Sequence, residues 1–290
     1  MPHLAAADGT RLFYNDWGTG RPVVLIHGWP LDADMWEYQV PDLVAAGYRV
    51  VAYDRRGFGR SDQPATGYDY DTLADDLKAL MEGLDLPQAT LVGFSMGGGE
   101  VARYLSRHGA QRVKSAVLIS AVTPGLLEGP GNPDGVPASV FAEMIEGLKT
   151  DRPAFLGTFG KQFYGAGMLN FQVSSELLAW TANVAMLASP IATMACVKAF
   201  AETDFRGDMA AFTVPTLIIH GSADATVPID KSADRTAELI PNALYRVYED
   251  APHGLFFTDK HRLNPDLLVF LDGGIEAASH RKLEGGKTLI

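Results

Sequence analysis

Ser95 has the sequence context of a catalytic nucleophile. It is the central residue of GFSMG at residues 93–97, which follows the apolar run ATLV at 89–92 and precedes a helix-forming segment at 98–105. This pattern predicts a sharp turn between a strand and a helix, with the serine at its apex. The glycines on both sides leave room for close backbone approach. The hydroxyl group is therefore expected to point outward, where a substrate can reach it.

A serine hydroxyl is a weak nucleophile until a neighbouring base takes its proton. Of the seven histidines, His253 lies in a loop directly after the final apolar strand, from which its side chain can reach back over a sheet. The acid that orients it is expected between serine and histidine along the chain. Asp224 follows the strand-forming run at 216–220, and Asp230 lies farther on. We favour Asp224, because it is closer to the strand end, and predict a Ser95–His253–Asp224 triad.

Acyl transfer also needs N–H donors for the carbonyl oxygen on which negative charge develops. One is expected from the backbone of Met96, which follows the nucleophile. The other is expected from HGWP at residues 27–30, a loop after an early apolar strand, in which the Trp29 N–H is the candidate. Pro30 restricts Trp29 to extended conformations. We interpret His27 as a structural residue that holds this loop through hydrogen bonds.

Apolar strands alternate with helical segments along much of the chain. Strands are predicted at residues 11–16, 22–26, 48–53, 89–92, 113–119, 216–220 and 244–248, and helices at 35–46, 71–81, 98–105 and 263–271. Continuous apolar strands that are separated by helices indicate a mostly parallel sheet with helices on both faces. In such an α/β fold the three candidate catalytic residues all follow the carboxyl ends of strands.

The alternation stops after Ser120. Residues 124–137 are rich in glycine and proline, and residues 138–205 carry helical patterns without a clear strand. We interpret this region as a helical cap over the carboxyl edge of the sheet. The predicted segments are the first part of the core (1–121), the cap (122–206), the second part of the core (207–273) and a polar tail without apolar periodicity (274–290).

The composition argues against several classes of protein. The chain has 290 residues, of which 47% are hydrophobic, and a net charge of −11. This acidic balance, without a basic stripe, argues against nucleic-acid binding. No run approaches the roughly 18 apolar residues of a membrane span, and the N-terminal residues lack the pattern of a signal peptide. A single cysteine, Cys196, allows no disulfide within the chain. We therefore expect a cytoplasmic protein without nucleic-acid or membrane partners.

Phosphate and metal sites are not expected. The glycines of RRGFGRSD at residues 55–62 match neither the dinucleotide-binding spacing nor the P-loop spacing. No cluster of residues has the spacing of metal ligands. The sequence therefore predicts neither a bound cofactor nor a metal.

Five segments together resemble the cofactor-free haloperoxidases, or perhydrolases, and their aryl-esterase relatives in the α/β-hydrolase fold. They are HGWP at 27–30, DRRGFGRS at 54–61, GFSMGGG at 93–99, AETDF at 201–205 and APHG at 251–254. The resemblance extends from about residue 4 to residue 271 and includes the cap. It implies Ser95, Asp224 and His253 as the triad, with Trp29 and Met96 as oxyanion donors. It also implies activity without metal or haem, and a homo-oligomer that is a trimer or a dimer of trimers.

The resemblance implies hydrolysis of small carboxylic esters through an acyl-enzyme, and perhydrolysis when hydrogen peroxide replaces water. The partners would be a small ester or carboxylic acid with water or peroxide. We expect apolar side chains to line the substrate pocket, namely Phe94, Pro30, Phe159, Phe163, Phe200, Val227 and Phe256. A lactonase, an amidase such as a γ-lactamase, or a carbon–carbon bond hydrolase would use the same triad. A ligand receptor that has kept the hydrolase fold is an alternative from another class, because fold does not determine function.

Overall fold

The computed structural model describes residues 2–167, 173–281 and 286–289. Its strands are β1 (His3–Ala5), β2 (Arg11–Trp17), β3 (Pro22–Ile26), β4 (Arg49–Tyr53), β5 (Ala89–Phe94), β6 (Val113–Ile119), β7 (Thr216–Gly221), β8 (Leu244–Tyr248) and β9 (Gly286–Leu289). Its α-helices are α1 (Val40–Ala45), α2 (Tyr70–Gly83), α3 (Met96–His108), α4 (Ala138–Phe163), α5 (Ser175–Met186), α6 (Pro190–Glu202), α7 (Ala233–Leu239), α8 (Leu255–Thr258) and α9 (Lys260–His280). Short 3-10 turns occupy η1 (Ala33–Tyr38), η2 (Met209–Ala211) and η3 (Ile229–Lys231).

The centre of the sheet is parallel, as predicted. The strand order is β1-β2-β4-β3-β5-β6-β7-β8-β9, and the six neighbours from β4 to β8 run parallel. Outside this parallel block, β1, β2 and β9 pair antiparallel with their neighbours. Parallel neighbours need long crossover connections, which the helices supply. All seven predicted strands are confirmed, while β1 and β9 were not predicted from the sequence.

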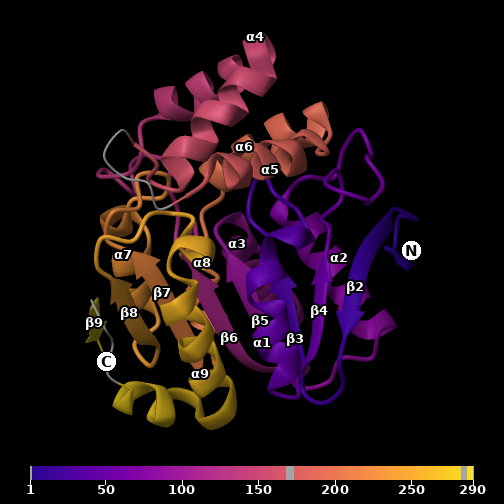
Figure 1. Ribbon diagram of the computed structural model, residues 1–290, viewed down its shortest axis with the longest axis vertical. Helices are drawn as coiled ribbons and strands as arrows, with labels where there is room; N and C mark the ends of the chain where they lie inside the picture. The colour runs from indigo at the N-terminus through magenta and orange to yellow at the C-terminus, as the bar shows by residue number, and fades with distance from the viewer. Residues whose placement is uncertain (1, 168–172, 282–285, 290) are drawn as a thin grey trace.

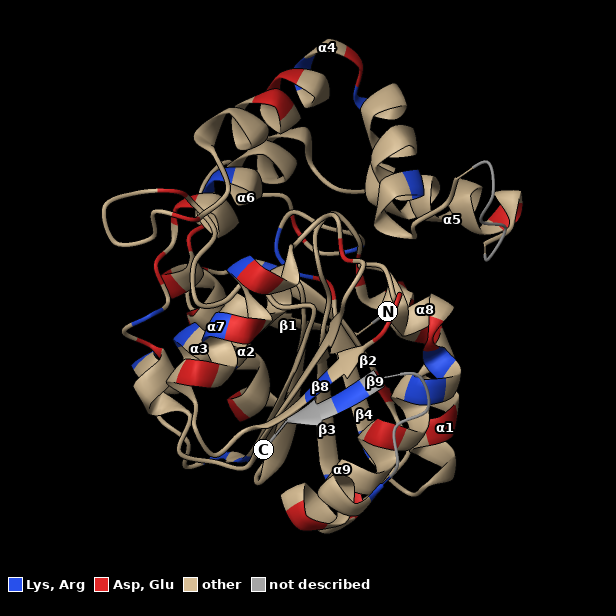
Figure 2. Cartoon of the chain, turned by 90° about the vertical axis from the view of Figure 1, so that its left-hand side faces the viewer, with Lys and Arg blue, Asp and Glu red and all other residues tan. Residues whose placement is uncertain are grey.

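Each central strand buries both of its faces, which explains its unbroken apolar sequence. In β3, Val24 and Ile26 belong to one core and Val23 and Leu25 to the other, and all four side chains are fully buried. Successive side chains of a strand point to opposite faces, so a continuous apolar run fills two cores at once. Figure 2 shows α2, α3 and α7 on one side of the sheet and α1, α8 and α9 on the other.

The helices α4, α5 and α6 lie between β6 and β7 in the chain and form a cap above the strands (Figure 1). The cap helix α4 has two arms, because the backbone at Asp151 leaves helical geometry (φ −152°, ψ 85°) and Pro153 follows. The Asp151 carboxylate accepts the Ala154 N–H at 3.0 Å and so begins the second arm. At Gly147 a Cβ atom would lie 2.5 Å from the ring of Phe155, so this glycine lets the two arms pack closely. We keep residues 122–206 as the proposed limits of the cap.

The segment predicted as a polar tail contains regular structure. Helix α9 continues to His280 across a break at Gly274, where φ is 65°. The side chain of Ala278 is buried, and its carbonyl oxygen accepts a hydrogen bond from the buried guanidinium of Arg246. Beyond it, β9 pairs with β8. No sequence pattern indicated this structure in the polar tail, because backbone pairing at a sheet edge needs no apolar periodicity.

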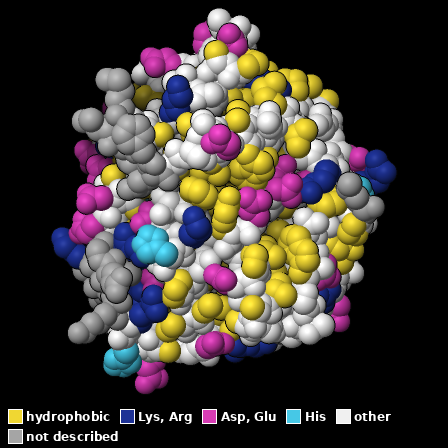
Figure 3. Space-filling model, in the orientation of Figure 1, with side chains coloured by type: hydrophobic (Ala, Val, Ile, Leu, Met, Phe, Trp, Pro, Cys, Tyr) yellow, Lys and Arg dark blue, Asp and Glu magenta, His cyan; other side chains and the backbone are white. Residues whose placement is uncertain are grey.

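Charged groups are dispersed over the surface that Figure 3 presents, where Lys and Arg side chains are scattered among acidic and apolar ones. Of the helices that the structure describes, no single one is long and apolar enough to cross a membrane. The bent pair α5 and α6, which meet at 97°, passes that test only when the two are taken together.

Candidate active site

The serine turn is strained and tightly packed. Ser95 lies between β5 and α3 with φ 53° and ψ −117°, a conformation that non-glycine residues rarely adopt. A Cβ atom on Gly93 would come within 2.5 Å of the Gly97 carbonyl oxygen, and one on Gly97 equally close to the carbonyl oxygen of Ile26. Both glycines are therefore required by close backbone approach, and the geometry is that of the nucleophile turn that the sequence predicts.

Three side chains from distant loops form one chain of hydrogen bonds. His253 Nε2 lies 3.0 Å from Ser95 Oγ, and His253 Nδ1 lies 2.6 Å from Asp224 Oδ2. A carboxylate only accepts, so Nδ1 carries the proton, and Nε2 is then the acceptor for the serine hydroxyl. All three residues are buried. The arrangement can remove the proton from Ser95 as its oxygen attacks a carbonyl carbon.

Asp224 is held by more than its contact with His253. Its Oδ1 accepts the backbone N–H groups of Thr226 and Val227, at 2.9 and 2.7 Å. Its Oδ2 lies 3.2 Å from His220 Nε2, which also donates to the Val227 carbonyl at 2.8 Å. Burial alone would raise the pKa of Asp224, but the interactions with His253 and His220 outweigh it and lower that pKa well below its ordinary value. The carboxylate therefore stays ionised beside the imidazole.

The predicted oxyanion donors are available. Neither the Trp29 N–H nor the Met96 N–H donates a hydrogen bond within the described part of the chain. The loop that carries Trp29 is fixed by His27, as predicted: its Nδ1 lies 2.9 Å from the Gly28 carbonyl oxygen, and its Nε2 accepts the Arg55 N–H at 2.9 Å. Burial, together with the charge of Arg55, lowers the pKa of His27 well below its usual value, so the ring is neutral.

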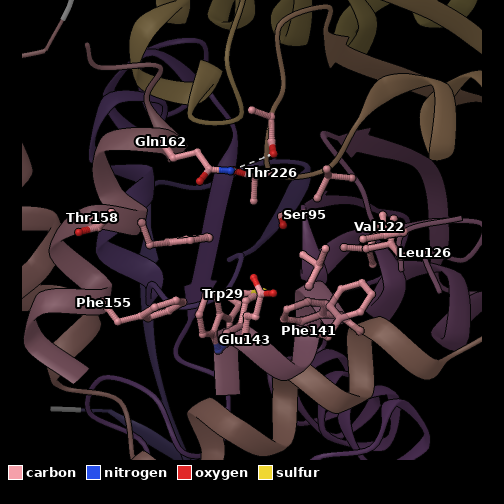
Figure 4. Close-up of a pocket in the computed structure, with 17 residues that line it drawn as sticks. Trp29, Ser95, Val122, Leu126, Phe141, Glu143, Phe155, Thr158, Gln162 and Thr226 are labelled. Atoms are coloured by element: carbon pink, nitrogen blue, oxygen red, sulfur yellow. Dashed lines mark hydrogen bonds between the residues drawn. The ribbon is translucent and has the colours of Figure 1, made fainter. Parts of the chain in front are cut away.

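A cavity of about 270 Å³ opens onto Ser95 (Figure 4). Three residues of the predicted pocket line it, namely Phe159, Phe200 and Val227, together with Trp29 of the predicted oxyanion loop. The remaining lining residues are Val122, Leu126, Val136, Val140, Phe141, Glu143, Met144, Phe155, Thr158, Gln162, Ala225 and Thr226. Most of these come from α4 and from the loops that follow β6 and β7. The Trp29 indole N–H donates to the Thr193 carbonyl of α6 at 3.0 Å, which ties this wall to the cap.

Comparison with known proteins identifies the family. The family model described as the alpha/beta hydrolase fold matches residues 21–260. The chain belongs to the α/β-hydrolase family. The non-heme chloroperoxidase CPO-A1 of Kitasatospora aureofaciens is 46% identical over 274 residues, which cover 94% of this chain and all of that protein. The bifunctional esterase/perhydrolase DCH of Acinetobacter calcoaceticus is 39% identical, with 93% and 99% covered.

A solved structure agrees with this assignment. The crystal structure of a bromoperoxidase from Bacillus anthracis superposes with a TM-score of 0.90 at 47% identity, and the match covers 93% of this chain and 99% of that one. This α/β-hydrolase therefore belongs to the branch that contains non-heme haloperoxidases and perhydrolases, as the sequence motifs indicate.

Three phenylalanines that were expected in the pocket of this hydrolase lie behind the triad instead. Phe94, Phe163 and Phe256 are almost completely buried and do not line the described cavity. The ring centroids of Phe94 and Phe163 each lie 4.9 Å from that of His253, and Phe256 packs on Phe94 at 5.1 Å. Pro30 is buried in its loop and is likewise absent from the cavity wall. We remove these four residues from the proposed pocket, and the rings instead fix the position of the imidazole.

Two contacts beneath the site were not predicted from sequence. His220 reaches Asp224 from the end of β7, as described above. In addition, the Arg55 guanidinium donates to the His27 carbonyl at 2.6 Å and pairs with Glu100 of α3, both side chains being fully buried. Tyr53 donates its hydroxyl to the other Glu100 oxygen at 2.6 Å. The pair connects the Trp29 loop to the helix that follows Ser95, so it holds the two segments that carry the predicted oxyanion donors.

Asp32 follows the oxyanion loop and is a source of pH-dependent stability. It is buried; its Oδ1 accepts the Asp34 N–H at 2.9 Å, and its Oδ2 has no hydrogen-bond partner among the described residues. Burial, and then the negative charge of Asp54, raise the pKa of Asp32 to about 7. An unfolded aspartate has a pKa of about 3.9. Between these two values the folded group holds a proton that the unfolded group has lost, so stability falls as the pH rises from about 4 to about 7.

Replacing Asp32 by asparagine is expected to remove this dependence. An asparagine keeps an oxygen for the Asp34 N–H and cannot ionise. Urea unfolding at several pH values should show a free-energy difference between variant and wild type that grows in favour of the variant by on the order of 2–4 kcal/mol as the pH rises from about 4 to about 7. A constant difference over that range would show that Asp32 does not titrate there.

The described residues contain no group of three or more His, Cys, Asp or Glu side chains placed to hold a metal ion. The cysteine, Cys196, is buried in the core of the hydrolase, and burial raises the pKa of its thiol to about 12. Its thiol is therefore protonated at neutral pH and acts as an apolar packing group.

Proposed function

We propose that this α/β-hydrolase is a serine esterase of small carboxylic esters, and that it forms peracids when hydrogen peroxide replaces water. The observation that carries the proposal is the Asp224–His253–Ser95 chain of hydrogen bonds beside an apolar cavity. The naming of one relative as a bifunctional esterase/perhydrolase supports the peroxide reaction. A cavity of about 270 Å³ fits a small substrate or a short acyl chain.

In the first half of the reaction, Ser95 Oγ attacks the ester carbonyl carbon while its proton passes to His253 Nε2. Asp224 holds the imidazole in the required tautomer and stabilises its positive charge. The carbonyl oxygen becomes an oxyanion and accepts hydrogen bonds from the Trp29 and Met96 N–H groups. When the tetrahedral intermediate collapses, the bond to the alkoxy oxygen breaks, His253 protonates the leaving alcohol, and the acyl group remains on Ser95.

In the second half, water or hydrogen peroxide attacks the acyl carbon and gives its proton to His253. Collapse then breaks the bond to Ser95 Oγ, which recovers the proton from His253. Water yields a carboxylic acid, and peroxide yields a peracid. A released peracid oxidises halide ions in solution, so this route to haloperoxidase activity requires no halide site on the protein.

Three further properties of the protein are proposed from the sequence alone. They are a cytoplasmic location, the absence of nucleic-acid and membrane partners, and a homo-oligomer that is a trimer or a dimer of trimers. A lactonase or a γ-lactamase remains the second candidate function, because the same triad and oxyanion donors open cyclic esters and amides.

The test is multiple turnover on a substrate panel. With p-nitrophenyl acetate in large excess, we expect nitrophenol release to continue far beyond one equivalent of enzyme, since water completes the cycle. With acetate and hydrogen peroxide, we expect peracid formation, measured through bromide oxidation. Release that stops after one equivalent would indicate a receptor that is acylated once. A higher kcat/KM on a lactone or a bicyclic lactam than on any ester would favour the second candidate function.

A further inference from the structure

Glu143 is the one charged side chain among the described residues that line the cavity. It lies on the first arm of α4, between Phe141 and Met144, which line the same cavity. Figure 4 draws its side chain between Trp29 and Phe141 in this view, among the residues that surround the cavity at Ser95. Within the described chain, its carboxylate makes no hydrogen bond or ion pair. The Glu143 carboxylate is therefore available to interact with a bound molecule.

The surroundings of Glu143 are aromatic. Trp29, Phe141, Phe155, Phe159 and Phe200 line the cavity together. Trp29 packs in T-shaped pairs with Phe159 and Phe200 at centroid distances of 5.1 and 5.9 Å, and Phe155 stacks on Phe159 at 6.1 Å. The faces of aromatic rings carry negative partial charge and attract cations, quaternary ammonium groups above all. The aromatic rings and the Glu143 carboxylate therefore both attract positively charged groups to this cavity.

We propose that the cavity selects substrates by charge, with Glu143 as the residue that determines this selectivity; the inference rests on the proposed esterase function. Esters that carry an ammonium group are favoured over neutral esters of the same shape. Free carboxylates, the acyl source for peracid formation from an acid and peroxide, are disfavoured. Glu143 is exposed to solvent, so water and salt screen its field, and we expect effects of roughly three- to tenfold.

The position of Glu143 depends on the bend in α4. The first arm brings Phe141 and Glu143 to the cavity, and the second arm returns Phe155 and Phe159 to it. Gly147 permits this return, as described for the fold. An acidic residue elsewhere on the same arm does not reach the cavity. Glu146, one helical turn further on, is exposed and accepts a hydrogen bond from the Thr150 hydroxyl at 3.4 Å.

The experiment compares Glu143→Gln with Glu146→Gln, because both variants remove one negative charge from the same arm of α4. Three acetyl donors of different charge are used: acetylcholine, its neutral isostere 3,3-dimethylbutyl acetate, and acetate with hydrogen peroxide. In Glu143→Gln, the ratio of kcat/KM for acetylcholine to that for the neutral ester should fall roughly three- to tenfold, and the ratio for acetate to the neutral ester should rise. The ratio of cationic to neutral ester in wild type should also fall between about 10 mM and about 200 mM salt.

The control variant separates a local effect from a general one. Glu146→Gln should leave all three values near those of wild type. The inference is overturned if Glu143→Gln does not change the ratio of cationic to neutral ester, or if Glu146→Gln changes it equally. Failure of the proposed function looks different: wild type would then turn over none of the three donors, and both variants would share that result.

Discussion

Replacing Ser95 by alanine is expected to lower kcat for p-nitrophenyl acetate by roughly 10⁴- to 10⁶-fold, because the acyl group loses the oxygen to which it is transferred. The variant should keep its fold. The side chain is small and faces the cavity, so the free energy of unfolding should change by less than about 1 kcal/mol. The two measurements are steady-state turnover and urea unfolding, made on the same preparation.

Ser120 provides a matched control. It is also a buried serine with positive φ, 46°, at the end of the neighbouring strand β6, and its hydroxyl has no hydrogen-bond partner in the described chain. Ser120→Ala should therefore leave turnover close to that of wild type. Near-normal turnover by Ser95→Ala, or an equal loss in the two variants, would contradict the assignment of Ser95 as nucleophile.

The layout of the fold was predictable because its strands are buried on both faces. A run such as PVVLI in β3 fills two cores and has no polar alternation, so it is visible in the sequence. The edge strands β1 and β9 are only three and four residues long. They are stabilised by backbone pairing with β2 and β8, which leaves no side-chain pattern. Sequence patterns therefore indicated the centre of the sheet and missed its edges.

The candidate site was predictable to the extent that its residues follow strand ends in a fixed chain order. The three triad residues come from the ends of β5, β7 and β8, which a parallel sheet brings to one edge. The residues that line the pocket were harder to predict, because phenylalanine serves both as cavity wall and as core packing. Phe159 lines the cavity, while Phe163, one helical turn away, packs on His253. The sequence could not place Glu143 in the cavity wall, since its position there depends on the bend of α4 at Asp151.

Replacing Asp224 and Asp230 in turn tests which of the two aspartates orients His253. Asp224→Asn should reduce kcat by roughly 10⁴-fold, because the amide favours the wrong imidazole tautomer. The loss is expected to be large here because Asp224 Oδ2 is the acceptor for His253 Nδ1, at 2.6 Å. The structure places no other carboxylate oxygen within hydrogen-bond distance of that imidazole in the described chain.

Asp230→Asn is the matched variant, since it makes the same chemical change six residues along the chain. The Asp230 side chain is 69% exposed and lies 3.8 Å from the ammonium group of Lys231, so it faces solvent and a surface cation. Removing its charge should change kcat by less than about twofold, because exposed ion pairs contribute little. Steady-state turnover of both variants decides between them, and circular dichroism checks that each is folded. A large loss in Asp230→Asn together with a small loss in Asp224→Asn would reverse the assignment of the acid, and Ser95 and His253 would then require a different orienting partner.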